Sequence, residues 1–315
     1  MRGGPLFVLL SGDEPLPQLR AGGRDMSLFD EVIDSYLERE PSLREEDVFH
    51  AHELGDCLRL SYYRRRLPIK HPPETLRLFE AGRYAHEFIR RVLGSQAAAE
   101  RGIRLLEAER PFTLCFDHFD IRCRPDDFIL VSLSPRAAGT VGLQETQGRE
   151  IPMIVEVKSV RGKKVDFITQ PSYPHCTQLH VYLRGKRLQY GTILYVARDS
   201  FATKPFTVFY DPYLWSATVQ RVSLLHECLT KNQLPPPEAK MTREELRKLF
   251  PDLPDGYLQG GSTPLRYMCF LCPLWRLCTA NVNPSRRRED GEGTRKPRAG
   301  DQDFPYPPPG VSTSS

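Results

Sequence analysis

Residues 153–159 read Met-Ile-Val-Glu-Val-Lys-Ser, a short run rich in β-branched side chains. Apolar and polar positions alternate here with a period of two residues, and this pattern predicts a β-strand. Side chains two residues apart in a strand share a face, so Glu156 and Lys158 lie together while Val155 and Val157 point the other way. An acid and a base in an otherwise buried strand are costly unless they pair or bind a metal ion.

A second carboxylate comes from the segment Arg124-Pro125-Asp126-Asp127, which precedes the apolar run 128–131. We expect a strand over residues 121–133, with Asp126 at a strand end beside residues 153–159. Two carboxylates and an ammonium group at one sheet edge suit metal-assisted phosphodiester hydrolysis, because carboxylates hold hard divalent cations and such cations lower the pKa of bound water. Lys158 would orient the nucleophile. The structural alternative is an edge strand that carries an ordinary surface Glu–Lys pair.

A histidine on a predicted helix adds to this set. The pattern over residues 74–93 predicts a helix that closes at Gly94, and His86 shares one of its stripes with Gly82. The small Gly82 permits close approach to a neighbouring element, so His86 is expected to point inward. The alternative is a core histidine with no chemical role.

The helix expected over residues 173–186 contributes a polar face. His175, Gln178 and Tyr182 are spaced at i, i+3 and i+7, so they share one side of the helix. We interpret them as hydrogen-bonding groups and an aromatic surface suited to a strand of nucleic acid. A polar stripe over the sheet is the alternative.

The remaining patterns predict one α/β domain, a mixed sheet flanked by helices, over residues 26–283. Further helices are expected at 27–38, 52–65 and 212–229, and further strands at 112–116, 192–196 and 206–209. Residues 134–150 and 238–266 have the character of insertions. Residues 1–25 are interpreted as a disordered leader or a mis-assigned start, and 284–315 as a disordered tail, because neither can bury enough apolar surface to offset its ordering entropy.

Composition places the chain among globular proteins. Of its 315 residues 40% are hydrophobic and 27% charged, and the net charge of +4 neither requires nor excludes a nucleic-acid partner. Because no apolar run approaches the roughly 18 residues of a membrane span, we expect neither a membrane protein nor a secreted one. The expected location is the cytoplasm. The sequence does not set the oligomeric state.

The eight cysteines indicate a metal site, because clustered thiols in a reducing compartment bind metal more often than they form disulfides. Cys269, Cys272 and Cys278 are separated by two and five residues. Three such thiolates need a fourth ligand, and Cys57, expected on the 52–65 helix, can supply it. An all-sulfur site suits zinc or an iron–sulfur cluster. The lack of a second cysteine pair favours a 4Fe–4S cluster that joins the N- and C-terminal segments; unligated buried cysteines are the alternative.

Taken in order, these residues resemble the RecB-like branch of the PD-(D/E)xK nuclease superfamily, and most of all its CRISPR-associated iron–sulfur exonucleases. The resemblance covers residues 48–280 and rests on the following set: Cys57, His86, Asp126, Glu156-Val157-Lys158, Gln178-x3-Tyr182, Cys269, Cys272 and Cys278. It implies a restriction-endonuclease-like sheet.

The resemblance also implies a role for each residue. His86, Asp126, Glu156 and the Val157 carbonyl would hold Mn²⁺ or Mg²⁺. Lys158 would position or activate water, Gln178 and Tyr182 would contact DNA, and the four cysteines would hold the 4Fe–4S cluster. The implied activity is metal-dependent cleavage of single-stranded DNA, often as an exonuclease. The implied partners are CRISPR integrase proteins, which such enzymes assist in preparing spacer precursors during antiviral defence.

The chain departs from the family pattern in two places besides the insertions. It has Cys57-Leu58-Arg59 where the family often has Cys-Pro-Arg, and Cys123 where a glycine is common. Two other functions stay open. One is a non-catalytic reader of DNA ends or motifs within an integrase complex, and the other is a general DNA repair nuclease of the same fold. The reader would use three basic groups: Arg64-Arg65-Arg66; Arg161 with Lys163-Lys164; and Arg184 with Lys186-Arg187.

Overall fold

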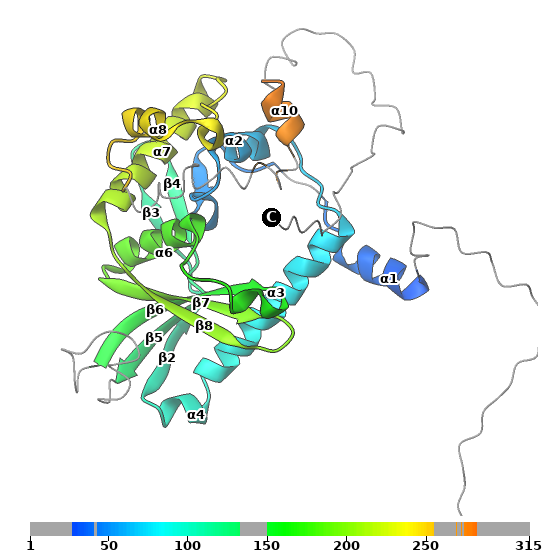
Figure 1. Ribbon diagram of the computed structural model, residues 1–315, viewed down its shortest axis with the longest axis vertical. Helices are drawn as coiled ribbons and strands as arrows, with labels where there is room; N and C mark the ends of the chain where they lie inside the picture. Colours follow the sequence, from blue (N-terminus) through cyan, green and yellow to red (C-terminus); the bar gives the residue numbers. More distant parts are fainter. Residues whose placement is uncertain are drawn as a thin grey trace, which may run out of the picture.

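The strand that contains Glu156 and Lys158, β6 (Glu150–Val160), lies at the centre of a five-stranded sheet in the computed structural model (Figure 1). The alternative of an edge strand is therefore wrong. The sheet order is β2-β5-β6-β7-β8, and it is mixed because β6 and β7 are parallel while the other neighbours are antiparallel. The structure describes residues 27–40, 43–132, 150–254, 269, 272 and 274–281. The other strands of this sheet are β2 (Ile103–Ala108), β5 (Asp127–Ser132), β7 (Tyr190–Ala197) and β8 (Thr203–Phe209).

A second sheet of three strands has the order β1-β4-β3. Its members are β1 (Val48–His50), β3 (Phe112–Cys115) and β4 (Asp120–Cys123). The single strand expected over 121–133 is wrong, because β4 and β5 belong to different sheets and the chain leaves one for the other at residues 124–126. Pro125 in this connection has no N–H to donate to a sheet, which favours a break there. Strands β1 and β2 were not predicted.

The helices over 27–38, 74–93, 173–186 and 212–229 are confirmed, as α1 (Leu28–Leu37), α3 (Pro73–Leu93), α6 (Tyr173–Lys186) and α7 (Pro212–Thr230). The helix expected over 52–65 is wrong in part: a short turn η1 (Ala51–Glu53) precedes α2 (Leu58–Arg66), and Cys57 caps α2 instead of lying within it. Between them the backbone of Gly55 lies directly against α6, because a Cβ there would lie 2.2 Å from the Cα of Pro174.

The shorter helical elements are α4 (Gln96–Ala99), η3 (Gly162–Val165), η4 (Glu238–Lys240), α8 (Arg243–Leu249) and α10 (Trp275–Thr279). Two of them, η4 and α8, lie in the segment 238–266, the second expected insertion, and residues 255–266 of it lie outside the described residues. The predicted leader 1–25, the tail 284–315 and residues 134–149 also lie outside them.

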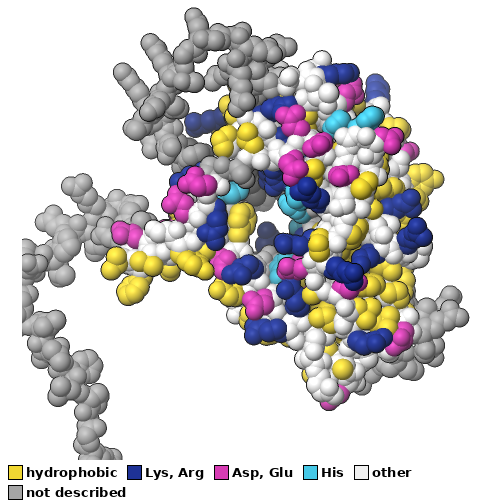
Figure 2. Space-filling model, turned by 180° about the vertical axis from the view of Figure 1, so that it is seen from behind, with side chains coloured by type: hydrophobic (Ala, Val, Ile, Leu, Met, Phe, Trp, Pro, Cys, Tyr) yellow, Lys and Arg dark blue, Asp and Glu magenta, His cyan; other side chains and the backbone are white. Residues whose placement is uncertain are grey.

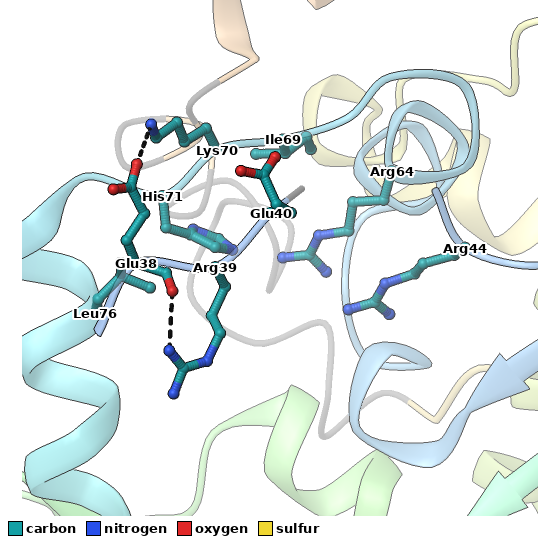
Figure 3. A pocket seen from close by; sticks show the side chains of 9 residues that line it. All are labelled: Glu38, Arg39, Glu40, Arg44, Arg64, Ile69, Lys70, His71 and Leu76. Atoms are coloured by element: carbon teal, nitrogen blue, oxygen red, sulfur yellow. Dashed lines mark hydrogen bonds and ion pairs between the residues drawn. The ribbon is translucent and has the colours of Figure 1, made fainter. Parts of the chain in front are cut away.

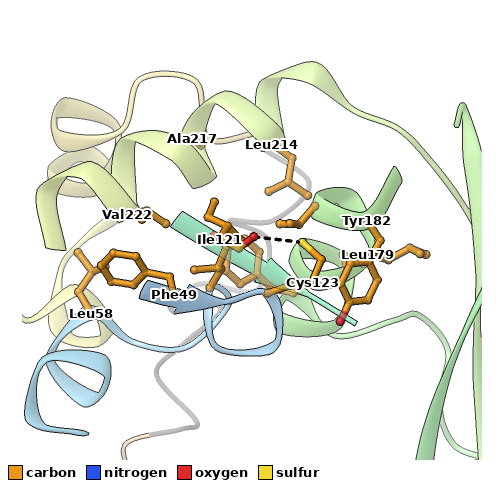
Figure 4. Close-up of a cluster of buried hydrophobic side chains, with 14 of the residues drawn as sticks. Phe49, Leu58, Ile121, Cys123, Leu179, Tyr182, Leu214, Ala217 and Val222 are labelled. Carbon is orange, nitrogen blue, oxygen red and sulfur yellow. Dashed lines mark hydrogen bonds between the residues drawn. The ribbon is translucent and has the colours of Figure 1, made fainter. Parts of the chain in front are cut away.

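Helices α3 and α6 cover opposite faces of the large sheet, as the alternation along β6 requires. Val155 and Val157 belong to the apolar cluster that contains Ile89 of α3. Ile154, on the other face, belongs to the cluster of α6 and α7. Figure 4 shows this second cluster, where side chains of β1, β4, α6 and α7 meet, among them Phe49, Ile121, Leu179 and Leu214.

Helix α1 begins with a capping box between Ser27 and Asp30 and projects from the body of the molecule (Figures 1 and 2). Most of its apolar side chains face solvent, with Phe29 79% and Tyr36 72% exposed, and only Leu37 at its end is buried. Ion pairs from Arg77 of α3 to Asp30 and Asp34 join it to the rest. Among the described residues, no helix has both the length and the apolar character that a membrane crossing requires.

Candidate functional site

Asp126 links α3 to the centre of the sheet. It immediately precedes β5, whose Asp127 pairs in register with Val155 of β6. One carboxylate oxygen accepts a hydrogen bond from the Val157 N–H at 2.8 Å, and the other lies 3.1 Å from Nδ1 of His86. The structure thus places the Val157 N–H against Asp126, and the metal contact of the Val157 carbonyl stays a prediction.

Gly82 accounts for the inward position of His86. A Cβ on Gly82 would meet the Ser159 hydroxyl of β6 at 3.0 Å, so α3 lies tightly against the sheet one turn before His86. The expectation that Gly82 permits close approach is confirmed.

Glu156 and Lys158 form the second half of the site. The Lys158 ammonium donates to Oε1 of Glu156 at 2.9 Å and to Oε1 of Gln178 at 2.7 Å. The Gln178 amide donates in turn to Glu156 Oε1 at 2.7 Å and to the Tyr182 hydroxyl at 2.9 Å. Tyr182 donates to the carbonyl of Arg124 at 3.2 Å, in the segment that carries Asp126.

Gln178 and Tyr182 are therefore interior groups. They are only 6% and 2% exposed, and their polar atoms contact Lys158, Glu156 and Arg124. Their polar atoms are used within the site, and a DNA contact of these two residues stays a prediction. His175 contacts the Tyr195 hydroxyl at 2.8 Å instead of joining Gln178. A helical pattern predicts which side of the helix a side chain occupies, but it does not predict how far that side chain is buried.

The two carboxylates at this site repel each other, whereas Lys158 and His86 attract them. Burial raises the pKa of Glu156, and the charge of Asp126 raises it further. Burial alone would lower the pKa of His86, but the hydrogen bond and charge of Asp126 raise it. Glu156 also has a buried oxygen, Oε2, with no hydrogen-bond partner among the described residues. An unpartnered carboxylate oxygen beside a second carboxylate is a place where a hard cation lowers the free energy.

The residue types fit a divalent cation, although, in the part of the chain that is described, no three His, Cys, Asp or Glu side chains already form a group that could hold a metal ion. Asp126 and Glu156 offer oxygen, and His86 offers a ring nitrogen. Adjustment of these side chains would be needed to ligate one ion together.

Asp127 is a residue that the sequence left unassigned. It is 1% exposed, burial and the charge of Asp126 raise its pKa to about 6, and its Oδ1 lies 3.6 Å from Nε of Arg90. The sequence shows two adjacent acids, Asp126 and Asp127, and their distance from Glu156 along the chain does not show which of them faces the site. Asp126 is the one that contacts His86 and Val157.

The four predicted cluster ligands line one cavity of about 360 Å³. Cys57, at the start of α2, faces the C-terminal residues Cys269, Cys272 and Cys278 across it, together with Arg59, Tyr63 and Trp275. None of these four cysteines forms a disulfide. The structure therefore brings together residues that lie more than 200 positions apart in the chain.

The cavity lining has the residue types that a sulfur-ligated group requires, although these described cysteines do not already form a group that could hold a metal ion. Burial raises the pKa of Cys57 to about 12, so its thiolate requires a nearby positive centre. Arg59 donates to the Cys278 carbonyl at 3.1 Å and lies 3.7 Å from its Sγ. An N–H directed at a ligand sulfur is one of the contacts that tune iron–sulfur clusters. Arg59 was not predicted to act here.

We expect Cys278→Ser to abolish binding of a sulfur-ligated group at this cavity. If the group is a 4Fe–4S cluster, anaerobically purified parent protein contains roughly four irons per chain and the variant far fewer. Iron content and visible absorption measure the effect. Cys115→Ser is the matched control, because Cys115 is exposed and lies outside the cavity. Equal iron in parent and Cys278→Ser would contradict the assignment.

Of the three basic groups of the reader hypothesis, the first is paired within the protein, and among the described residues of the third only Lys186 is. Arg65 is buried against Glu53 at 2.6 Å, and Arg66 pairs with Glu46. Lys186 pairs with Glu107 at 2.6 Å. Arg64 pairs with Asp56 but also lines a second cavity of about 230 Å³, into which Arg44 extends as well (Figure 3).

The comparisons with known proteins do not identify a family. No family model matches the sequence, and no curated protein matches it. The crystal structure of SSO0001 aligns with 81% of this chain and 98% of that chain, at 15% sequence identity and a TM-score of 0.42. At this level the alignment carries no argument about function.

Proposed function

We propose that this protein is a metal-dependent deoxyribonuclease that acts on ends of single-stranded DNA. The observation that carries the proposal is the Asp126–Glu156–Lys158 arrangement, in which a buried carboxylate with one unpartnered oxygen lies beside a second carboxylate and an ammonium group. Buried charge of this kind is costly to keep and is characteristic of catalytic sites.

His86, Asp126 and Glu156, with the Val157 carbonyl, are the proposed ligands of Mn²⁺ or Mg²⁺. When bound, the cation would lower the pKa of a water molecule and neutralise charge on the scissile phosphate. Lys158 uses two of its three N–H donors on Glu156 and Gln178, and its side chain is 18% exposed. Its third donor can therefore orient a water or a phosphate oxygen. Gln178 and Tyr182 would hold Lys158 and Glu156 in place.

The cysteine cavity is the proposed site of a 4Fe–4S cluster that joins the start of α2 to the C-terminal segment. Such a cross-link closes a long loop and would stabilise the fold. The role in CRISPR adaptation, with integrase proteins as partners, rests on the resemblance of the ordered motifs. So does the restriction-endonuclease-like character of the sheet.

The test is degradation of end-labelled single-stranded DNA by anaerobically handled protein. We expect cleavage with Mn²⁺ and none in EDTA, and Asp126→Asn should reduce the Mn²⁺-supported rate by at least about 100-fold, because it removes a ligand charge. Circularised single-stranded DNA should resist if an end is required.

Absence of cleavage by a cluster-loaded parent would contradict the proposal. Metal-independent binding with a steep salt dependence would then favour the non-catalytic reader.

A further inference from the structure

The loop that follows β6 exposes basic side chains next to the candidate site. Arg161, Lys163 and Lys164 are all exposed, and Phe167 is 79% exposed. Arg161 is three residues beyond Lys158 in the same extended segment, which corresponds to about 10 Å at the usual rise of a strand. Figure 1 shows this green segment close to α3, the helix that carries His86.

The loop has a fixed shape. Gly162 has φ of +45°, a left-handed conformation that favours glycine, and Val165 anchors η3 because it is only 2% exposed. The Arg198 N–H donates to the Val160 carbonyl at 2.9 Å, and Lys204 donates to the Asp166 carbonyl at 3.1 Å. These contacts hold η3 against the turn between β7 and β8. The exposed groups are thus presented by ordered backbone, which lowers the entropy cost of binding.

The charge of this surface is unbalanced. The loop and the β7–β8 turn (residues 198–202) carry four cations and two carboxylates: Arg161, Lys163, Lys164 and Arg198 against Asp166 and Asp199. Within the described ranges, no ion pair involves Arg161, Lys163 or Lys164, whereas all three arginines of the 64–66 group are paired with carboxylates.

We infer that residues 161–168, the η3 loop, bind single-stranded DNA beside the reacting phosphate. Lys163, Lys164 and Arg161 would contact backbone phosphates, and Phe167 would stack on a base. Exposed rings next to unpaired cations are the combination that binds single strands without sequence preference. The inference rests on the proposed nuclease function for its choice of ligand. To the proposed function it adds the protein surface on which the single-stranded DNA lies.

The test measures binding of a fluorescein-labelled oligothymidylate by fluorescence anisotropy. EDTA is present so that metal-dependent cleavage does not interfere. Phe167→Ala should weaken binding by about 5- to 150-fold, the range found for loss of one stacked base. Lys163→Ala/Lys164→Ala should weaken it and reduce the slope of log Kd against log salt by about 1.4, since each phosphate contact on a single strand contributes about 0.7. Phe167→Trp should retain binding.

The matched control is Lys248→Ala/Phe209→Ala. It removes one exposed cation and one ring that is 58% exposed, and Phe209 pairs with Tyr190 at the opposite end of β7 from the loop. This control should bind like the parent.

Two results would overturn the inference: loop variants that bind like the parent, or a parent that does not bind single-stranded DNA. In the first case Mn²⁺-dependent cleavage can still occur, so the proposed function would stand without the loop. Conversely, loop-dependent binding by a parent that never cleaves would support the surface and reject the nuclease. Weakening by the lysine changes alone, with binding unchanged in Phe167→Ala, would overturn the part of the inference that assigns base stacking to Phe167.

Discussion

Replacement of Lys158 by alanine is expected to lower the rate of DNA cleavage by about 10²- to 10⁴-fold, the range for removal of one positioned catalytic group. Lys158 is the only ammonium group that contacts both Glu156 and Gln178 among the described side chains. Its loss would remove the donor that orients the nucleophile. Single-turnover cleavage of end-labelled single-stranded DNA at saturating Mn²⁺ measures the chemical step directly.

The control for this variant is Lys231→Ala. Lys231 also pairs with a glutamate, Glu227, at 2.5 Å, but the pair lies exposed on α7. Exposed pairs contribute little, so both rate and stability should stay near those of the parent. A Lys158→Ala protein that is folded, loaded with its cluster and as active as the parent would exclude a catalytic role for this lysine.

The sequence predicted the centre of the site because its signal was local. In strand β6, Val155 and Val157 lie on one buried face, and Glu156 and Lys158 lie on the opposite face. This alternation depends only on the strand itself, so it can be read from the sequence without knowledge of the neighbouring elements. Asp126 was predicted because it lies only 30 positions before Glu156 in the chain and directly precedes an apolar strand. The contact between Asp126 and Val157 confirms that these segments are neighbours.

The supporting contacts could not be predicted, because they join positions that no local pattern relates. Arg59 donates hydrogen bonds to the carbonyls of Pro235 and Cys278. Every residue has a backbone carbonyl, so the sequence does not show which carbonyls a side chain will contact. Pro125 was visible, but the apolar residues on both sides of it suggested one long strand. Only the pairing of β4 with β1 and β3 shows that the chain changes sheets there.

Glu238→Gln is expected to destabilise the fold strongly, since it breaks a buried ion pair next to the start of α2, where Cys57 lies. The side chains of Arg221 and Glu238 are each 2% exposed and share two hydrogen bonds, of 2.6 and 3.0 Å. Burial opposes the charge of Arg221, but the charge and hydrogen bonds of Glu238 raise its pKa. Arg221 therefore stays charged and would be left without its counter-ion.

Loss of one partner of such a pair costs about 3–5 kcal/mol, which corresponds to a decrease of roughly 6–20 °C in Tm for a domain of this size. Arg221 also donates to the carbonyls of Leu54 and Asp56, and Glu238 accepts from the Leu58 N–H at 3.0 Å. Both contacts flank Cys57. Iron loading should therefore fall together with Tm.

Thermal unfolding of anaerobic protein, with iron content measured on the same samples, tests this expectation. Glu38→Gln is the control, because its pair with Lys70 lies more than half exposed on both sides and should shift Tm by little. Arg221→Met/Glu238→Leu should be less destabilised than the sum of the single changes, since neither charge is then left unpaired. A Glu238→Gln shift as small as that of Glu38→Gln would show that the buried pair does not hold this part of the fold together.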